Sequence, residues 1–139
     1  MGGHGLAKGA AGEQVTNPVN CDRAARGPDQ LKFQRELRRR HQESVAERRE
    51  HWIRAHSYFY DRLKRLLRFI VEPGKRVLEL GCETGHLLAS VEPSYGVGVE
   101  SSEAMLAVAG RKYSGLRFVS CDVQDVELNE TFVSFGKHA

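Results

Sequence analysis

Short apolar runs alternate with helix-like segments in the second half of the chain. Three of these runs have the length of a buried strand: 76–80, 95–100 and 116–121. Between them, helices are expected from about 85 to 91, with Thr84 as a candidate cap, and from 103 to 112, with Ser102 as the N-cap. Strands that alternate with helices in this way predict an α/β fold with a parallel sheet and right-handed crossovers.

A helical pattern precedes the first of these strands. Between 52 and 70, apolar residues recur at spacings of three and four: Trp52, Ala55, Phe59, Leu63, Leu66 and Ile70. This spacing predicts an amphipathic helix whose apolar face packs on the sheet. Tyr58 and Tyr60 flank one of these positions, and ordinary packing is favoured for both over lining a pocket. Pro73 and Gly74 end the helix.

The segment 29–50 is dense in Arg, Gln and Glu and has a thin apolar stripe, so its helix needs a partner. From 29 to 70 there are 12 Lys or Arg against 6 Asp or Glu, whereas from 71 to the end there are 6 against 10. The run Arg38–Arg40 could meet phosphates, but a solvated helix face is favoured because no aromatic residues interleave it.

Composition divides the chain into three parts. Residues 1–28 are rich in glycine, alanine and small polar residues and predict a disordered leader. A basic helical segment covers 29–70, and the α/β domain covers 71–139. With 139 residues, 40% of them hydrophobic, the chain is long enough for one modest domain.

Targeting and cysteine patterns favour a cytoplasmic protein. The sequence contains no run of about 18 apolar residues, so no membrane span is expected. The N-terminus also lacks the apolar core of a secretory signal. The three cysteines, Cys21, Cys82 and Cys121, match no zinc or redox spacing, so free thiols and no metal site are expected. We interpret Cys82 as a small residue tolerated beside a ligand, with a reactive thiol as the alternative.

The segment 77–100 carries the candidate chemistry. It reads as strand, glycine turn, helix, strand and terminal acid, the first part of a nucleotide-binding βαβ unit. Gly81 and Gly85 permit a close backbone approach to a ligand, and the helix after them presents free N–H groups. Glu100, at the end of the second strand, can accept hydrogen bonds from ribose hydroxyls.

The loop departs from the dinucleotide fingerprint G-x-G-x-x-G. Glu83 replaces the second glycine and His86 replaces the third. A carboxylate facing a pyrophosphate is costly, which argues against NAD. S-adenosylmethionine carries a sulfonium and an ammonium, so acidic residues around the loop are compatible with it.

The stretch Glu79-Leu80-Gly81-Cys82-Glu83-Thr84-Gly85 resembles motif I, E/D-x-G-x-G-x-G, of the class I (Rossmann-like) S-adenosylmethionine-dependent methyltransferases. The resemblance runs from about Phe59 to Phe132. It implies a three-layer α/β/α parallel sheet, truncated after about three to four strands. Where the family continues with an aspartate and an apolar strand, this chain has 133–139 and ends, so we expect a fragment with an exposed sheet edge.

The resemblance also implies roles for individual residues. The loop from Gly81 through Cys82 to Gly85 would hold the methionine portion, and Glu79 would help to orient its ammonium. Glu100 would bind the ribose hydroxyls. The remaining positions concern adenine: Asp122 would accept from its amino group, and the backbone of Val123 would reach its edge. Ser101 stands where the family usually has an aliphatic residue that packs on the ring, which should weaken that contact.

His86 is expected on the helix surface, and Glu83 has no assigned role. No catalytic residue can be named, because in the family the acceptor and any base come from later elements. A small-molecule, lipid or sugar-type acceptor is favoured over nucleic acid. Two alternatives stay open: a non-catalytic interaction or nucleic-acid-binding module that uses the basic helices, and an NAD-type nucleotide-binding protein. The oligomeric state is not indicated.

Overall fold

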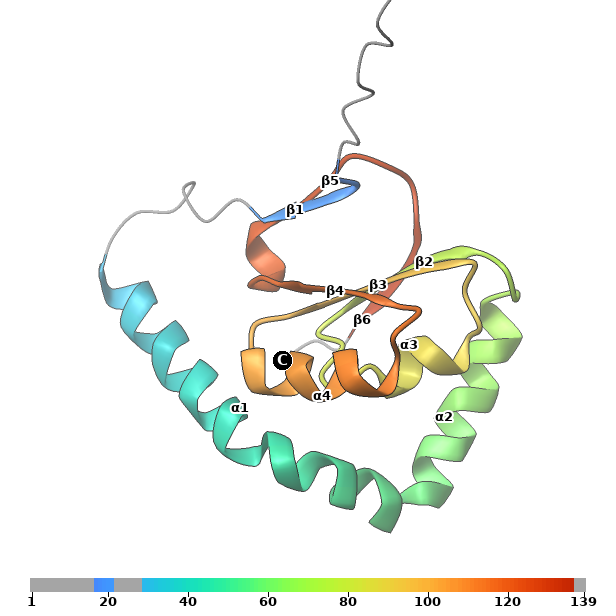
Figure 1. Cartoon of the computed structure of the whole chain (residues 1–139), viewed down its shortest axis with the longest axis horizontal. Helices are drawn as coiled ribbons and strands as arrows, with labels where there is room; N and C mark the ends of the chain where they lie inside the picture. Colours follow the sequence, from blue (N-terminus) through green and yellow to red (C-terminus); the bar gives the residue numbers. More distant parts are fainter. Residues whose placement is uncertain (1–16, 22–28, 137–139) are drawn as a thin grey trace, which may run out of the picture.

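A four-stranded parallel sheet forms the centre of the molecule (Figure 1). The computed structural model describes residues 17–21 and 29–136. In the order in which they lie, the strands are β4 (Arg117–Ser120), β3 (Tyr95–Glu100), β2 (Arg76–Leu80) and β6 (Val133–Gly136). The predicted α/β class with a parallel sheet is confirmed, and the number of strands lies within the predicted range of three to four.

Apolar side chains point to both faces of the sheet, as expected for parallel strands covered on both sides. Leu78 lies opposite Val97 in the register of β2 and β3, and both are fully buried on one face. Val77 is buried on the opposite face with Leu88. The bounds predicted for β2 and β3 match those observed, because each run is long enough to be buried as a strand and ends at turn residues.

The position of the fourth strand was not assigned from the sequence. Val133–Gly136 pairs parallel to β2, with Phe135 opposite Glu79. Phe135 and the partly buried Leu67 of the helical segment pack against the same buried clusters, which include Leu88 and Tyr60. This short run has two apolar residues, Val133 and Phe135, and it pairs along the edge of β2 that β3 leaves open.

Helices lie along one face of the sheet (Figure 1). They are α2 (Ser57–Ile70), α3 (His86–Ser90) and α4 (Glu103–Lys112), while the long α1 (Asp29–Ala55) runs beside α4. Ser102 caps α4 as predicted, since its hydroxyl accepts the N–H of Met105 at 3.3 Å. At α3 the N-cap is Gly85 rather than Thr84. A free N–H near the start of α3 is instead bound by a carboxylate of β2: Glu79 Oε2 accepts the N–H of Leu88 at 3.0 Å.

The helical segment differs from its prediction in two respects. The helix is interrupted at His56. Trp52 therefore belongs to α1, and α2 begins at Ser57. The predicted apolar stripe also does not face the sheet: four of its members, Trp52, Phe59, Leu66 and Ile70, are exposed. The buried face is rotated around the helix and carries Tyr60, with Leu63 and Leu67 partly buried. The segment has more apolar residues than one face can hold, and periodicity alone did not show which face would be covered.

A small antiparallel pair, β1 (Val19–Cys21) with β5 (Val126–Leu128), covers the other face of the sheet. Val19 is buried against Leu78 and Val99 in that layer. This part of the predicted leader is therefore ordered, while 1–16 and 22–28 lie outside the described residues. Among the described residues, no helix is both long and apolar enough to cross a membrane.

The prediction of free thiols is wrong for two of the three cysteines. Cys21 and Cys121 form a disulfide, with their Cα atoms 5.7 Å apart, and Cys82 is free and buried. The two cysteines are 100 residues apart in the sequence, so the short spacings of known cysteine motifs could not pair them.

We expect thiol counting to reproduce this pairing. Iodoacetamide added to the folded protein without reductant should label none of the cysteines, because Cys82 is only 4% exposed and the other two are oxidised. Unfolding in guanidinium without reductant should release one reactive thiol per chain, and unfolding with reductant should release three. Intact-mass spectrometry gives the count, and three labels without reductant would contradict the disulfide.

Candidate functional site

The residues predicted to contact a cofactor meet at one edge of the sheet. The loop Gly81–Gly85 follows β2, Glu100 ends β3, and Asp122 follows β4. Because the strands are parallel, their carboxyl ends lie along the same edge, which is where ligands bind in open α/β sheets. The structure thus brings these predicted residues together, and their contact with a cofactor remains a prediction.

Two backbone bonds hold the glycine loop against β3. The N–H groups of Gly81 and Cys82 donate to the carbonyl of Val99 at 2.8 and 3.0 Å. Gly81 and Gly85 have φ values of 75° and 79°, a region that favours glycine. At Gly85 a side chain would also lie about 3.0 Å from the ring of Phe118. Both glycines are therefore required by the shape of the loop.

Glu83 stands at the position of the missing motif glycine and also has a positive φ, 51°. Its carboxylate accepts from Arg49 of α1 at 2.7 Å from Nε and lies 2.6 Å from Nη2. This two-point ion pair offsets the cost of a left-handed conformation in a residue with a side chain. The sequence gives no sign of this role for Glu83, because nothing in the spacing shows which of the many arginines reaches it.

The carboxylate of Glu100 is buried and accepts several hydrogen bonds from the protein. Oε2 accepts the N–H of Glu83 at 3.0 Å. Oε1 accepts the N–H groups of Ser101 and Ser102 at 2.8 and 3.1 Å, and the Ser101 hydroxyl lies 3.3 Å away. These bonds engage much of the acceptor capacity of a carboxylate. A ribose at this residue must therefore exchange hydroxyl bonds for some of them.

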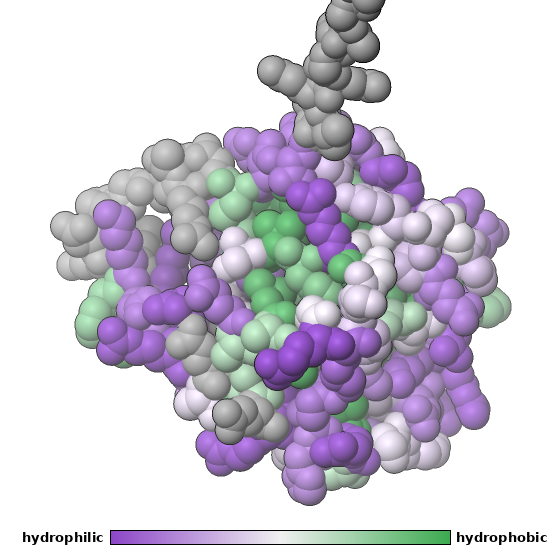
Figure 2. Space-filling view, viewed as in Figure 1, coloured by the Kyte–Doolittle hydropathy of each residue, from purple (hydrophilic) through white to green (hydrophobic). Residues whose placement is uncertain are grey.

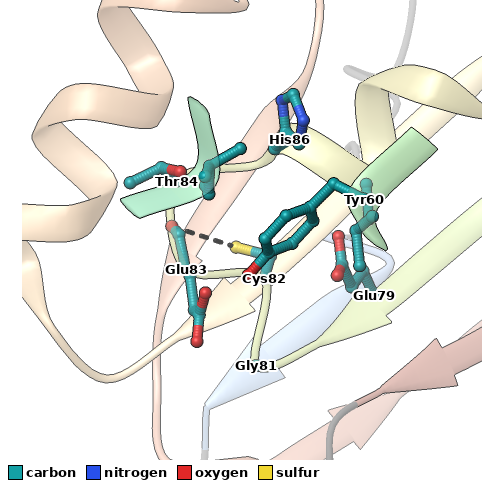
Figure 3. A pocket seen from close by; sticks show the side chains of 9 residues that line it. Tyr60, Glu79, Gly81, Cys82, Glu83, Thr84 and His86 are labelled. Carbon is teal, nitrogen blue, oxygen red and sulfur yellow. Dashed lines mark hydrogen bonds between the residues drawn. The ribbon is translucent and has the colours of Figure 1, made fainter. Parts of the chain in front are cut away.

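A small cavity lies beside the loop (Figure 3). Glu79, Cys82 and Thr84 contribute to its walls, and Ile53 of α1 and Tyr60 of α2 close it from the helical side. In Figure 3 the side chains of Glu83 and Glu79 lie on different sides of the Tyr60 ring.

Two titratable groups in this cavity are held uncharged. Burial raises the pKa of the Cys82 thiol, and the carboxylates of Glu79 and Glu100 add to the effect, so this cysteine is a poor nucleophile. Burial also lowers the pKa of His86, with Lys64 and Lys112 contributing.

His86, expected on the helix surface, is only partly exposed. Its ring is half-buried, packs edge-on against Tyr60 at 5.9 Å, and has Nδ1 3.4 Å from the Tyr113 hydroxyl.

Of the residues predicted to contact adenine, Ser101 follows β3, and Asp122 and Val123 follow β4. Asp122 Oδ1 accepts the N–H of Gln124 at 3.1 Å and caps a 3-10 turn, η1 (Val123–Asp125). Its Oδ2 lies 3.5 Å from Nε of Arg35, which also reaches Asp125 at 3.5 Å. Val123 is 42% exposed, and Ser101 turns its polar groups toward Glu100. Arg35 of α1 thus forms an ion pair with Asp122, the acid that was predicted to accept a hydrogen bond from the adenine amino group.

Figure 2 shows hydrophobic residues gathered near the middle of the visible face, where β4, β5 and η1 lie in Figure 1, with hydrophilic residues around them. This surface adjoins the carboxyl end of β4. An apolar surface next to hydrogen-bonding groups is suited to a heteroaromatic ring.

Sequence comparisons do not assign the chain. A scan against protein-family models finds no match, and a search of curated proteins finds no similar one. A search of solved structures does find similar folds, at low sequence identity.

The DhpI–SAH complex is 22% identical, with a TM-score of 0.51, over 61% of this chain and 43% of DhpI. SAM-bound CalS10, an amino pentose methyltransferase from Micromonospora echinaspora, is 20% identical, with a TM-score of 0.47, over 81% of this chain and 44% of that one. A TehB-like SAM-dependent methyltransferase from Corynebacterium glutamicum is 22% identical, with a TM-score of 0.48, over 58% and 44%.

The chain spans less than half the length of these solved structures. At this identity the likeness concerns the fold alone. Over the part it covers, the chain shares the fold of DhpI, a Rossmann-like parallel sheet with helices.

Proposed function

We propose that this chain binds S-adenosylmethionine at the carboxyl edge of its sheet and forms the cofactor-binding part of a methyltransferase. One observation carries the proposal: the glycine loop, Glu100 and Asp122 lie together at the edge where this fold receives ligands. The loop would hold the methionine portion, Glu100 the ribose, and Asp122 with the backbone of Val123 the adenine.

The charges of the site favour a cationic ligand over a dinucleotide. Glu79 lines the cavity beside the loop, and the carboxylate of Glu100 accepts the loop N–H of Glu83, whose own carboxylate is paired with Arg49. A pyrophosphate at this position would meet carboxylates at short range, whereas the sulfonium and ammonium of S-adenosylmethionine would be attracted to them. The cofactor, when bound, supplies an activated methyl group. Ile53 and Tyr60 must move for its methionine portion to enter, because they close the small cavity.

The contribution of the chain's own residues is to bind and orient. Methyl transfer depends on holding an acceptor in line with the sulfonium. We assign no catalytic base and no acceptor, and we favour a small-molecule, lipid or sugar-type acceptor over nucleic acid on the sequence argument alone. Isothermal titration with S-adenosylmethionine and with NAD tests the proposal, and binding of NAD alone would overturn it.

Replacing Glu100 with Gln should weaken binding of S-adenosylhomocysteine by roughly 10- to 150-fold. The reason is that hydrogen bonds to a charged acceptor contribute about 1.5–3 kcal/mol. Since Glu100 also bonds the loop, we expect a loss of unfolding free energy as well, measured by chemical denaturation.

A 2′,3′-dideoxy analogue separates the two roles of Glu100. If the carboxylate contacts the ribose, the wild-type chain should prefer the natural ligand strongly and Glu100→Gln should lose most of that preference. An equal preference in both proteins would limit Glu100 to holding the loop.

Replacing Arg35 with Gln should strengthen binding of S-adenosylhomocysteine by about two- to fivefold. This change releases Asp122 from an ion pair, and partly exposed pairs of this kind contribute about 0.5–1 kcal/mol. Arg40→Gln is the matched control, because Arg40 loses the same charge but pairs with Glu36 within α1. Unchanged or weaker binding in Arg35→Gln, measured by titration calorimetry, would show that adenine does not use Asp122.

A further inference from the structure

Helix α2 has a second apolar face that the described part of the molecule leaves uncovered. Tyr60, Leu63 and Leu67 pack toward the sheet. Five other large side chains on α2 are between 54% and 87% exposed: Tyr58, Phe59, Leu66, Phe69 and Ile70. We call these five residues the outer face of α2.

The outer face is continuous. At about 100° per residue, Phe59, Leu66 and Ile70 fall within about 40° of one another around the helix, and Phe69 and Tyr58 follow on one side. Phe69 is 87% exposed, the highest value among the exposed large apolar residues. Scattered exposed apolar residues are ordinary, but five on one side of a single 14-residue helix form a patch that indicates an interaction surface.

Basic side chains accompany this face. Helix α2 carries four basic residues, Arg62, Lys64, Arg65 and Arg68, against one acid, Asp61. By the same angular count, Arg62 falls inside the outer face, and its guanidinium lies 5.7 Å from the centre of the Tyr58 ring and donates to the Tyr58 hydroxyl at 3.2 Å. Arg65 is exposed and falls at the border of the face.

The basic side chains of the outer face favour an anionic surface over a second copy of this chain as its binding partner. A second copy packed on the outer face would bring Arg62 and Arg65 toward their own counterparts, and like charges at short range are unfavourable. An anionic surface removes this objection. A helix with exposed Phe, Leu and Ile on one side and Arg beside them has the composition of helices that lie in a membrane interface.

We propose that the outer face of α2 docks this chain on an anionic lipid surface. Phe59, Leu66, Phe69 and Ile70 enter the acyl boundary, and Arg62 and Arg65 lie at the level of the lipid phosphates. The charge distribution orients the molecule in the same sense. From 29 to 70 the chain has 12 basic against 6 acidic residues, and from 71 onward it has 6 against 10, so the acidic α/β domain turns away from the lipid. This docking is independent of cofactor binding.

Vesicle co-sedimentation of the full chain tests the proposal. We expect binding to vesicles of phosphatidylcholine mixed with phosphatidylglycerol, much weaker binding to phosphatidylcholine alone, and loss of binding as salt is raised. Phe69→Ser should weaken binding roughly tenfold, the effect of withdrawing one large apolar side chain from the interface, and Arg62→Gln should weaken binding to the anionic vesicles selectively.

The matched control is Phe33→Ser on α1, because Phe33 is also largely exposed, at 66%, but lies on another helix. It should bind vesicles as the wild type does, and circular dichroism should show all variants folded. The proposal is overturned if neutral and anionic vesicles bind alike, or if Phe69→Ser binds like the wild type. It is also overturned if light scattering shows a dimer that Phe69→Ser abolishes, or if an RNA or DNA oligonucleotide is bound in place of vesicles.

Discussion

The buried carboxylate of Glu100 holds the candidate site in its observed form. It accepts the N–H of Glu83 from the glycine loop and the N–H groups of Ser101 and Ser102 at the start of α4. A buried charge is tolerated only with such partners, so the loop, the end of β3 and the first turn of α4 are fixed with respect to one another. The same oxygens are those proposed to receive a ribose. Ligand binding at this residue is therefore an exchange of hydrogen bonds rather than the filling of open acceptors.

Ion pairs attach α1 to this edge of the sheet. Arg49 pairs with Glu83 on the loop, Arg35 lies near Asp122 after β4, and Glu50 pairs with Lys112 at the end of α4. Burial acts to raise the pKa of Glu50, but the hydrogen bond and charge of Lys112 outweigh it and the pKa is lowered. The basic composition of α1 thus serves contacts within the molecule as well as its solvated face. Two of these pairs use acids beside the proposed cofactor, which couples the position of α1 to the site.

Helix α2 connects the interior to the exterior of the molecule. Its inner residues Tyr60 and Leu67 pack near the loop and β6, and Tyr60 also closes the cavity. Its outer face carries Phe59 and Phe69, both strongly exposed. One helix therefore forms a wall of the candidate site and presents an apolar surface that we assign to lipid.

The sequence alone determined the α/β class, the bounds of β2 and β3, and the cap of α4 by Ser102. It did so because buried parallel strands are short continuous apolar runs and caps are local. The parallel arrangement also made it possible to expect that Gly81–Gly85, Glu100 and Asp122 would meet at one edge.

Only the tertiary structure decided the face of α2 that is buried, the strand formed by Val133–Gly136, the disulfide between Cys21 and Cys121, and the partners of Glu83 and Asp122. Each of these depends on which surfaces meet when distant segments pack together, and neither periodicity nor spacing along the chain contains that information.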